Sequence, residues 1–290
     1  MTSPCIICGH HDHGHVFTKQ GFELVRCRFC DLVFVTQQPE IEELKKLYSF
    51  ETGYHAGYEA IGTTEEGDLK WETARARRHL GDIRRYKASG RLLDVGCSAG
   101  FFLKEARTAG WEVCGVELSE NTAAIARRRF GLDVRTGILT DDLFAPGSFD
   151  VVTLWDVVEH LKDPVSVLTT VKQLLKRDGI LLLETPNIDG LFPRLSYKVA
   201  PWLDYWPHPE PPAHLFQFSK KTIDRLLEKV GLQTVEIRDW RSPLAYSLGS
   251  LSTLAHSPKR LAYALAFAPP LMIGPMLGQG DSLAVAAIKA

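Results

Sequence analysis

Residues 92–100 read Leu92-Leu93-Asp94-Val95-Gly96-Cys97-Ser98-Ala99-Gly100, and this stretch decides the fold of the 290-residue chain. Its apolar first half predicts a buried strand, and the small residues after it predict a tight turn into a helix that begins near Phe102. A strand, a glycine-containing turn and a helix form the first part of a βαβ unit. The stretch therefore predicts a parallel α/β sheet, provided that further units follow it.

Further strands and helices alternate through the rest of the chain. Apolar runs predict strands at 113–117, near Val134, and at 149–155, 180–183, 234–237 and 282–288. Helices are predicted between them, with N-caps at Ser119, Asp163 and Ser219. Strands that are apolar on both faces are typical of parallel sheets covered by helices. We expect a Rossmann-like, doubly wound sheet of seven mostly parallel strands over residues 89–290.

Charge and composition narrow the function classes. The chain has 34 basic and 35 acidic residues, a net charge of −1, 45% hydrophobic residues and 24% charged residues. This is the profile of a globular protein without the strongly basic surface typical of nucleic-acid binding, so a nucleic-acid partner is disfavoured. Met1–Cys5 shows no basic segment followed by an apolar run, so we expect no signal peptide and a cytoplasmic location.

The turn after the first strand predicts a nucleoside-containing cofactor. In doubly wound sheets, ligands bind beyond the carboxyl ends of the strands. Glu117 ends the second predicted strand, about 20 residues after the turn, where a carboxylate can accept both ribose hydroxyls. The turn lacks the G-x-G-x-x-G spacing that a dinucleotide pyrophosphate requires, which disfavours an NAD-dependent dehydrogenase.

Three segments resemble class I S-adenosylmethionine-dependent methyltransferases. The turn is similar to their D/E-x-G-x-G-x-G loop, with Ser98 in place of the middle glycine. Residues 149–164, FDVVTLWDVVEHLKDP, are similar to the fourth-strand segment of ubiquinone-pathway O-methyltransferases. Residues 214–219, followed by a helix and Gly231-Leu232, resemble the next segment of that family. The resemblance covers roughly residues 89–240.

The resemblance implies S-adenosylmethionine as cofactor and assigns its binding site. The implied residues are Asp94, Gly96, Cys97, Ser98, Gly100, Glu117, Leu118, Gly137, Ile138, Leu139 and Asp156. Residues of the turn would line the amino acid and ribose, and Glu117 would accept the ribose diol. Leu118 and residues 137–139 would surround adenine, and Asp156 would lie near the methionine end.

Four cysteines near the N-terminus predict a zinc site. Cys5-x2-Cys8 and Cys27-x2-Cys30 are separated by 18 residues, the spacing of a structural tetrathiolate zinc site. Residues 1–40 are therefore expected to form a zinc-ribbon-like module. A redox dithiol pair is the alternative, and a histidine of residues 10–15 is a second candidate ligand. Cys97 and Cys114 stand alone and are expected to be buried thiols.

Residues 41–88 predict a helical linker or lid, with two helices around a polar loop. The second helix, near residues 71–86, carries five arginines: Arg75, Arg77, Arg78, Arg84 and Arg85. A run of basic residues on a helix is usually a solvated face, and we expect that here.

Two histidines are candidate catalytic bases if the acceptor is a hydroxyl. His160 follows the fourth strand, and His214 lies in a predicted loop at 191–218 after the fifth. Position favours His214 as the base and places His160 at the cofactor end. Tyr205 and His208 are weaker candidates, and a histidine after a strand can equally bond a backbone carbonyl.

The sequence leaves three alternatives for the function, which differ in the methyl acceptor or in whether there is one. The first is a small molecule, sugar or lipid-linked compound methylated at oxygen. Sugar C-methyltransferases resemble the chain at both ends, but they have Tyr and Glu where this chain has Pro211 and Ala213. The second is an RNA or protein acceptor docked by the zinc module, although residues 1–40 hold Lys19, Arg26 and Arg28 against four acidic residues. The third is a non-catalytic protein that binds the cofactor or acts through zinc-mediated interaction.

Residues 241–280 form an apolar insert before the last strand. Residues 261–280 carry no charge and are long enough to cross a membrane. Pro269-Pro270 and Gly274-Pro275 are expected to break a helix there, and the strand at 282–288 must rejoin the same sheet. We expect inserted helices that cover the sheet or form a homodimer contact. Peripheral contact with a membrane through 261–280 is the alternative.

Overall fold

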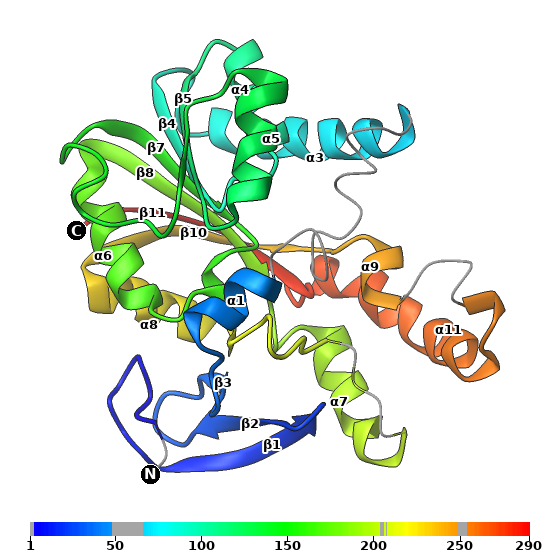
Figure 1. Ribbon diagram of the computed structural model, residues 1–290. Helices are drawn as coiled ribbons and strands as arrows, with labels where there is room; N and C mark the ends of the chain where they lie inside the picture. The colour runs from blue at the N-terminus through cyan, green and yellow to red at the C-terminus, as the bar shows by residue number, and fades with distance from the viewer. Residues whose placement is uncertain (1–2, 48–65, 204–205, 207, 249–253) are drawn as a thin grey trace.

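The computed structural model describes residues 3–47, 66–203, 206, 208–248 and 254–290. Its centre is a seven-stranded sheet in the order β10-β11-β8-β7-β4-β5-β6 (Figure 1). The strands are β4 (Arg91–Val95), β5 (Glu112–Glu117), β6 (Val134–Thr136), β7 (Phe149–Trp155), β8 (Leu175–Pro186), β10 (Leu232–Trp240) and β11 (Ser282–Lys289). Only β11 runs antiparallel to its neighbours within this sheet. The predicted Rossmann-like fold is confirmed.

Helices cover both faces of the sheet. One face carries α3 (Glu66–Arg84), α4 (Phe101–Thr108) and α5 (Glu120–Phe130), and the other carries α6 (Pro164–Leu174) and α8 (Lys220–Val230). Alternation along β4 shows the two-sided core, because Leu92 packs toward α3–α5 and Leu93 packs toward α6 and α8. Because both faces of each central strand are buried, these strands appear in the sequence as continuous apolar runs and not as alternating apolar and polar residues.

The predicted helix caps are present. Ser119 accepts a hydrogen bond from the Thr122 amide, and Asp163 Oδ1 accepts one from the Ser166 amide at 2.9 Å. Ser219 and Thr222 form a capping box at the start of α8. These caps fix where α5, α6 and α8 begin, and so fix the loops at the carboxyl ends of the strands.

The N-terminal module is tied to the rest of the chain by a shared sheet. Its strands β1 (His13–Lys19), β2 (Phe22–Cys27) and β3 (Val33–Val35) are joined by β9 (Phe216–Gln217) in the order β1-β2-β3-β9. Several of its buried residues, among them Val25, Leu32 and Phe34, belong to the same apolar cluster as one face of the main sheet, whereas Leu24, Val33 and Val35 form a small cluster of their own. The sequence did not indicate β2 or the pairing of β3 with β9, because that pairing joins strands about 180 residues apart.

Two sequence expectations about helices need correction. The predicted loop at 191–218 begins with a helix, α7 (Leu191–Leu203). The expected break at Pro269-Pro270 is wrong, because α11 (Pro258–Ile273) runs through both prolines and ends in the 3-10 turn η2 (Gly274–Leu277). The carbonyls that lose a partner belong to Leu265 and Ala266, which are exposed, so water can satisfy them.

The insert between β10 and β11 consists of α9 (Leu244–Leu248), α11 and η2, with residues 249–253 outside the described part. Within the described residues, Pro258–Leu277 is one segment long and apolar enough to cross a membrane by length and composition alone. Between α1 (Ile41–Leu47) and α3, the predicted polar loop lies largely in residues 48–65, which the structure does not describe.

Candidate functional site

A cavity of about 910 Å³ opens at the carboxyl ends of β4, β5, β7 and β8. Its described lining contains ten of the eleven residues predicted for the cofactor: Asp94, Gly96, Cys97, Ser98, Glu117, Leu118, Gly137, Ile138, Leu139 and Asp156. Pockets for one drug-sized ligand measure about 300–1,000 Å³. This cavity is at the upper end of that range, which suits a cofactor and an acceptor together.

Glu117 is held in place by two backbone amides. Its Oε2 accepts from the Ser98 amide and its Oε1 accepts from the Ser119 amide, both at 2.9 Å. Burial raises the pKa of Glu117, and these amides lower it. Each carboxylate oxygen keeps a further lone pair. The side chain is therefore fixed and able to accept two more hydrogen bonds, as a ribose diol requires.

Asp94 and the turn after it line the floor of the cavity. Thr153 Oγ1 donates to Asp94 Oδ1 at 2.7 Å, and burial raises the pKa of Asp94 to about 7. Gly96 has φ +73°, and a Cβ there would lie 2.6 Å from Val157 Cγ2. Ser98 also has a positive φ, 49°, and its buried Oγ has no hydrogen-bond partner within the described residues. A strained residue with an unpaired hydroxyl beside a cavity fits a ligand-binding turn.

Gly100 is not part of the lining formed by the described residues. It precedes α4 with φ +80°, and a Cβ there would lie 2.7 Å from Leu132 Cδ1 and 2.8 Å from Ala126 Cβ. The structure therefore shows a packing role for Gly100, in which α4 approaches α5 closely, and its contact with the cofactor stays a prediction.

Helix α3 supplies charges to the cavity. Arg75 Nη2 donates to Asp156 Oδ2 at 2.5 Å, and Arg78 Nη2 donates to Glu184 Oε2 at 2.6 Å. The expectation of a solvated basic face is wrong for these two arginines but fits Arg77, whose side chain is 73% exposed. Helix α3 lies across the ends of β7 and β8, where carboxylates attract its arginines.

The far wall of the cavity contains residues that the sequence did not indicate. His79 stacks on Trp155 at 3.9 Å between ring centroids and lies 2.9 Å from Glu184 Oε2. Burial lowers the pKa of His79, so its imidazole is neutral at pH 7. The Arg78 guanidinium lies 3.9 Å from the ring centroid of Trp240. These contacts depend on the register of α3 over the sheet, which no local motif shows.

The two candidate catalytic histidines lie side by side. Their ring centroids are 4.6 Å apart, and His160 Nδ1 lies 2.9 Å from the Ala213 carbonyl oxygen. His160 lines the cavity, whereas His214 is buried behind it and is outside the described lining. Burial lowers the pKa of His214 well below its usual value. Of the two, His160 borders the cavity formed by the described residues, and which of them acts as a base stays a prediction.

Glu159 completes a cluster with these histidines. Its Oε2 accepts from Thr185 Oγ1 at 3.0 Å, and its Oε1 lies 3.9 Å from His160 Nε2. Burial raises the pKa of Glu159 well above its usual range. The cluster brings three possible metal-ligand side chains together, with ligand atoms within 4.8 Å of one another: Glu159, His160 and His214. Such an arrangement can share a proton or bind a metal ion.

The N-terminal module holds the segment that carries His214. Lys19 Nζ donates to the carbonyl oxygens of Trp206 and Pro209 at 3.1 and 2.6 Å. The Val35 amide donates to Leu215 O at 2.9 Å, and the Leu215 amide donates to Glu159 O at 2.8 Å. A continuous set of hydrogen bonds thus links the module, this segment and the cavity wall.

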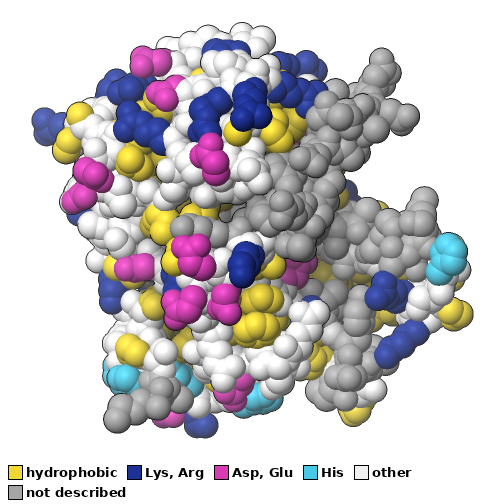
Figure 2. All heavy atoms as spheres, in the orientation of Figure 1, with side chains coloured by type: hydrophobic (Ala, Val, Ile, Leu, Met, Phe, Trp, Pro, Cys, Tyr) yellow, Lys and Arg dark blue, Asp and Glu magenta, His cyan; other side chains and the backbone are white. Residues whose placement is uncertain are grey.

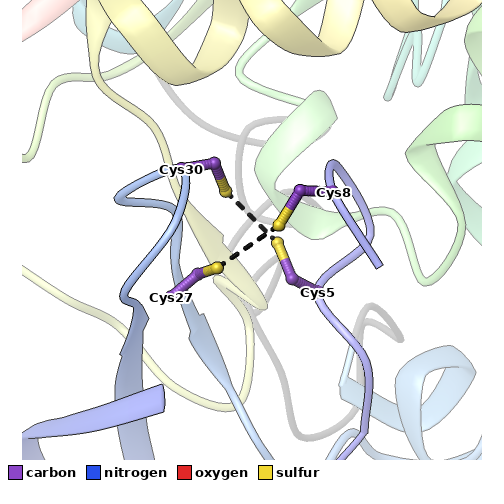
Figure 3. Close-up of side chains that lie close together, drawn as sticks. All are labelled: Cys5, Cys8, Cys27 and Cys30. Carbon is purple, nitrogen blue, oxygen red and sulfur yellow. Dashed lines mark hydrogen bonds between the residues drawn. The ribbon is translucent and has the colours of Figure 1, made fainter. Parts of the chain in front are cut away.

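The four predicted zinc ligands meet in one cluster (Figure 3). Cys5 Sγ lies 3.4 Å from Cys30 Sγ, and Cys8 Sγ lies 3.4 Å from Cys27 Sγ. Four thiolates about 2.3 Å from a tetrahedral zinc ion would be about 3.8 Å apart. The donor set and its spacing fit zinc. Among the nearby histidines, His10 stacks on Phe29, and His15 Nε2 lies 3.1 Å from Thr18 Oγ1.

Comparison with known proteins places the chain among methyltransferases. The sequence model of a family described as a methyltransferase domain matches residues 70–237. A ubiquinone biosynthesis O-methyltransferase of Thiobacillus denitrificans is 34% identical over 112 residues, which cover 37% of this chain and 48% of that protein. Its counterpart in Cereibacter sphaeroides is 33% identical over 121 residues, covering 40% and 49%. The chain spans about half the length of these curated relatives.

Solved structures show the same fold. A SAM-dependent methyltransferase from Archaeoglobus fulgidus aligns with a TM-score of 0.53 and 20% identity, covering 81% of this chain and 100% of that one. A phosphoethanolamine N-methyltransferase 2 of Haemonchus contortus, in complex with S-adenosyl-L-methionine, aligns with a TM-score of 0.55 and 19% identity, covering 89% and 61%.

Proposed function

We propose that this chain, which belongs to the methyltransferase domain family, is an S-adenosylmethionine-dependent enzyme that methylates a hydroxyl oxygen of a small molecule with an apolar body. The observation that carries the proposal is the Glu159–His160–His214 cluster, which borders the cavity next to the cofactor end. The names of the relatives, which are O-methyltransferases, support oxygen as the acceptor atom.

The cofactor half of the cavity would hold S-adenosylmethionine, which supplies an electrophilic methyl group on a sulfonium centre. Glu117 would accept the ribose hydroxyls, and Leu118, Ile138 and Leu139, which line the cavity, would pack around adenine. Asp94 would pair with the cofactor ammonium, which would favour its ionised form despite burial. The glycine at 96 keeps the backbone close to the cofactor.

The acceptor half favours an apolar compound. Its lining includes Leu44, Trp71, Trp240 and Pro243. The two arginines that α3 brings to this wall are paired, Arg75 with Asp156 and Arg78 with Glu184, so neither is an isolated cation for an anionic acceptor. A phenol or another hydroxyl compound, sugar or lipid-linked, fits such a wall better than a polyanion.

His160 is the proposed base. Donation of its Nδ1 proton to Ala213 O fixes the tautomer in which Nε2 carries the basic lone pair, and we assign Nε2 as the atom that accepts the hydroxyl proton. Glu159 Oε1 lies 3.9 Å from His160 Nε2, so an imidazolium there would favour the ionised form of Glu159, which burial otherwise disfavours. His214, packed against the His160 ring, is a positioning residue. The enzyme otherwise aligns the two reactants.

Single-turnover rates of His160→Gln and His214→Gln test this assignment. We expect His160→Gln to slow methyl transfer by about 10²–10⁴-fold and His214→Gln by much less, with cofactor affinity unchanged in both. A simple catechol, a hexose and an RNA transcript serve as acceptors, each with and without added Mg²⁺ after chelation. Equal rates in His160→Gln and the native protein would contradict the assignment of His160 as the base. A rate that requires Mg²⁺ would show that the Glu159–His160–His214 cluster binds a metal ion instead.

The zinc module has a structural role in the same proposal. Zinc bound by Cys5, Cys8, Cys27 and Cys30 has a closed coordination sphere without a position for a substrate. The module's sheet pairs with β9, and Lys229 and Arg225 of α8 donate to the carbonyls of Ile7 and Cys30. Part of the module's surface is therefore already in contact with α8 and β9. This favours a role in supporting the acceptor half over a role in docking RNA or protein. We place the reaction in the cytoplasm.

A further inference from the structure

Helix α11 presents an apolar stripe to solvent. Leu261, Leu265, Met272 and Met276 are 44%, 69%, 54% and 85% exposed. Their spacings of four, seven and four residues keep them on one face through α11 and the turn after it. The opposite face carries Tyr263, Ala264 and Leu271, which pack with Phe192 of α7. The helix is therefore already partnered on one side, and its exposed stripe is a separate surface.

The lobe that carries this stripe is basic. We define the basic lobe as the described residues 190–203, 241–248 and 254–280, which include α7, α9 and α11. It contains five Lys or Arg residues and no Asp or Glu, in a chain whose net charge is −1: Arg194, Lys198, Arg241, Lys259 and Arg260. Arg194, Lys198, Lys259 and Arg260 are exposed, and Trp202 on α7 is 84% exposed. Figure 2 shows basic and apolar side chains together on this projecting lobe.

The insert begins and ends at the same place in the fold. The Ser242 amide donates to Asp281 Oδ1 at 3.0 Å, and the Gly280 amide donates to Asp239 Oδ1 at 2.9 Å. Strands β10 and β11 then pair directly. A single crossing of a bilayer would separate these two strands, so the geometry permits contact with a membrane surface but not a span.

We infer that the basic lobe rests on the surface of an anionic lipid bilayer, with the α11 stripe in the interface and the basic side chains against lipid phosphates. Helices that lie in a membrane interface share three features. They have apolar residues along one face, an exposed tryptophan nearby, and basic residues around them with no acidic residues. Association of two copies through the same face would bring two positive surfaces together, which is unfavourable. The inference does not depend on which acceptor the enzyme uses.

Vesicle flotation tests the inference with the full-length, zinc-loaded protein. The vesicles contain phosphatidylcholine alone or phosphatidylcholine mixed with phosphatidylglycerol. We expect the native protein to float with the mixed vesicles and much less with the neutral ones. Lys259→Gln/Arg260→Gln should lower partition into the mixed vesicles by roughly thirtyfold, from about fivefold per basic residue. Leu265→Ser/Met272→Ser/Met276→Ser should lower partition into both by at least roughly tenfold.

Two controls keep the outcome clear. Val235→Ser removes an apolar side chain that is 51% exposed on β10, outside the lobe, and should float like the native protein. Cofactor affinity, measured by calorimetry, should be the same in all variants, which separates this inference from the proposed reaction. Native protein that stays unbound with mixed vesicles overturns the inference. A native dimer that the triple serine variant converts to a monomer, without flotation, makes the stripe a contact between copies.

Discussion

The two halves of the cavity are built in different ways. The cofactor half consists of residues at the ends of neighbouring strands, so Asp94, Ser98 and Glu117 meet because β4 and β5 are parallel neighbours. The acceptor half is lined by α1, α3, the turn after β7 and the end of β10. The segment that leads into β9, which the N-terminal module contacts, lies behind this lining and bonds to His160. The first half follows from local sequence and the second from long-range contacts. Mutations should therefore separate cofactor binding from methyl transfer.

The largest expected effect is on the cofactor half. Glu117→Ala removes the acceptor of the ribose diol and leaves the Ser98 and Ser119 amides without their partner. Loss of two hydrogen bonds to a charged group, at about 1.5–3 kcal/mol each, should weaken S-adenosylmethionine binding by more than about 100-fold. Calorimetric titration measures this. Near-native affinity would contradict the assigned site.

Gly100→Ala should lower stability without changing cofactor affinity. The positive φ and the contacts with Leu132 and Ala126 should cost about 2–4 kcal/mol in the free energy of unfolding. Gly96→Ala, the matched variant at the cavity, should also weaken cofactor binding, because its Cβ meets Val157 in the lining. Urea unfolding and calorimetry of the pair would show the difference. Loss of affinity in Gly100→Ala alone would restore that residue to the cofactor site.

Cofactor binding should depend on pH through Asp94. Burial raises its pKa to about 7, so the unbound site holds a proton below that pH. A cofactor ammonium pairs with the ionised form, so affinity should fall about tenfold for each pH unit below about 7. The free energy of unfolding of the unbound protein should change in the opposite direction and decrease as pH rises toward 7. The reason is that, in this pH range, Asp94 holds a proton in the folded state but not in the unfolded state. Asp94→Asn should remove both dependences, and an unchanged profile would show that another group causes them.

The smallest expected effect concerns the link between the module and the acceptor half. Lys19→Met keeps the apolar stem and removes the two hydrogen bonds to Trp206 and Pro209. Loss of these two hydrogen bonds should raise the free-energy barrier to methyl transfer by about 1 kcal/mol, which slows the reaction about fivefold. Cofactor affinity should stay the same. Arg26→Met, also in the module, serves as a control. Equal rates in Lys19→Met and the native protein would show that this link does not position the segment.

Local patterns predicted the cofactor half and the zinc ligands, whereas tertiary contacts determined the rest. The structure brings Asp94, Gly96, Ser98 and Glu117 together at the cavity, and it brings the four cysteines into one cluster, because both groupings depend on short spacings. Arg75 and Arg78 were predicted to be solvated, since nothing near them in sequence shows the carboxylates of Asp156 and Glu184. Sequence position also did not show that His160 borders the cavity while His214 is buried, because that burial depends on β9, whose partner β3 lies about 180 residues away.

Removal of zinc tests the division between the two halves most directly. The native protein should contain one zinc ion, and a strong chelator should remove it from the four cysteines. We expect the zinc-free protein to retain S-adenosylmethionine affinity within about threefold while its single-turnover rate falls about 100-fold, because the segment with His214 loses its support. Equal loss of both quantities, or an unchanged rate with the metal removed, would contradict the account.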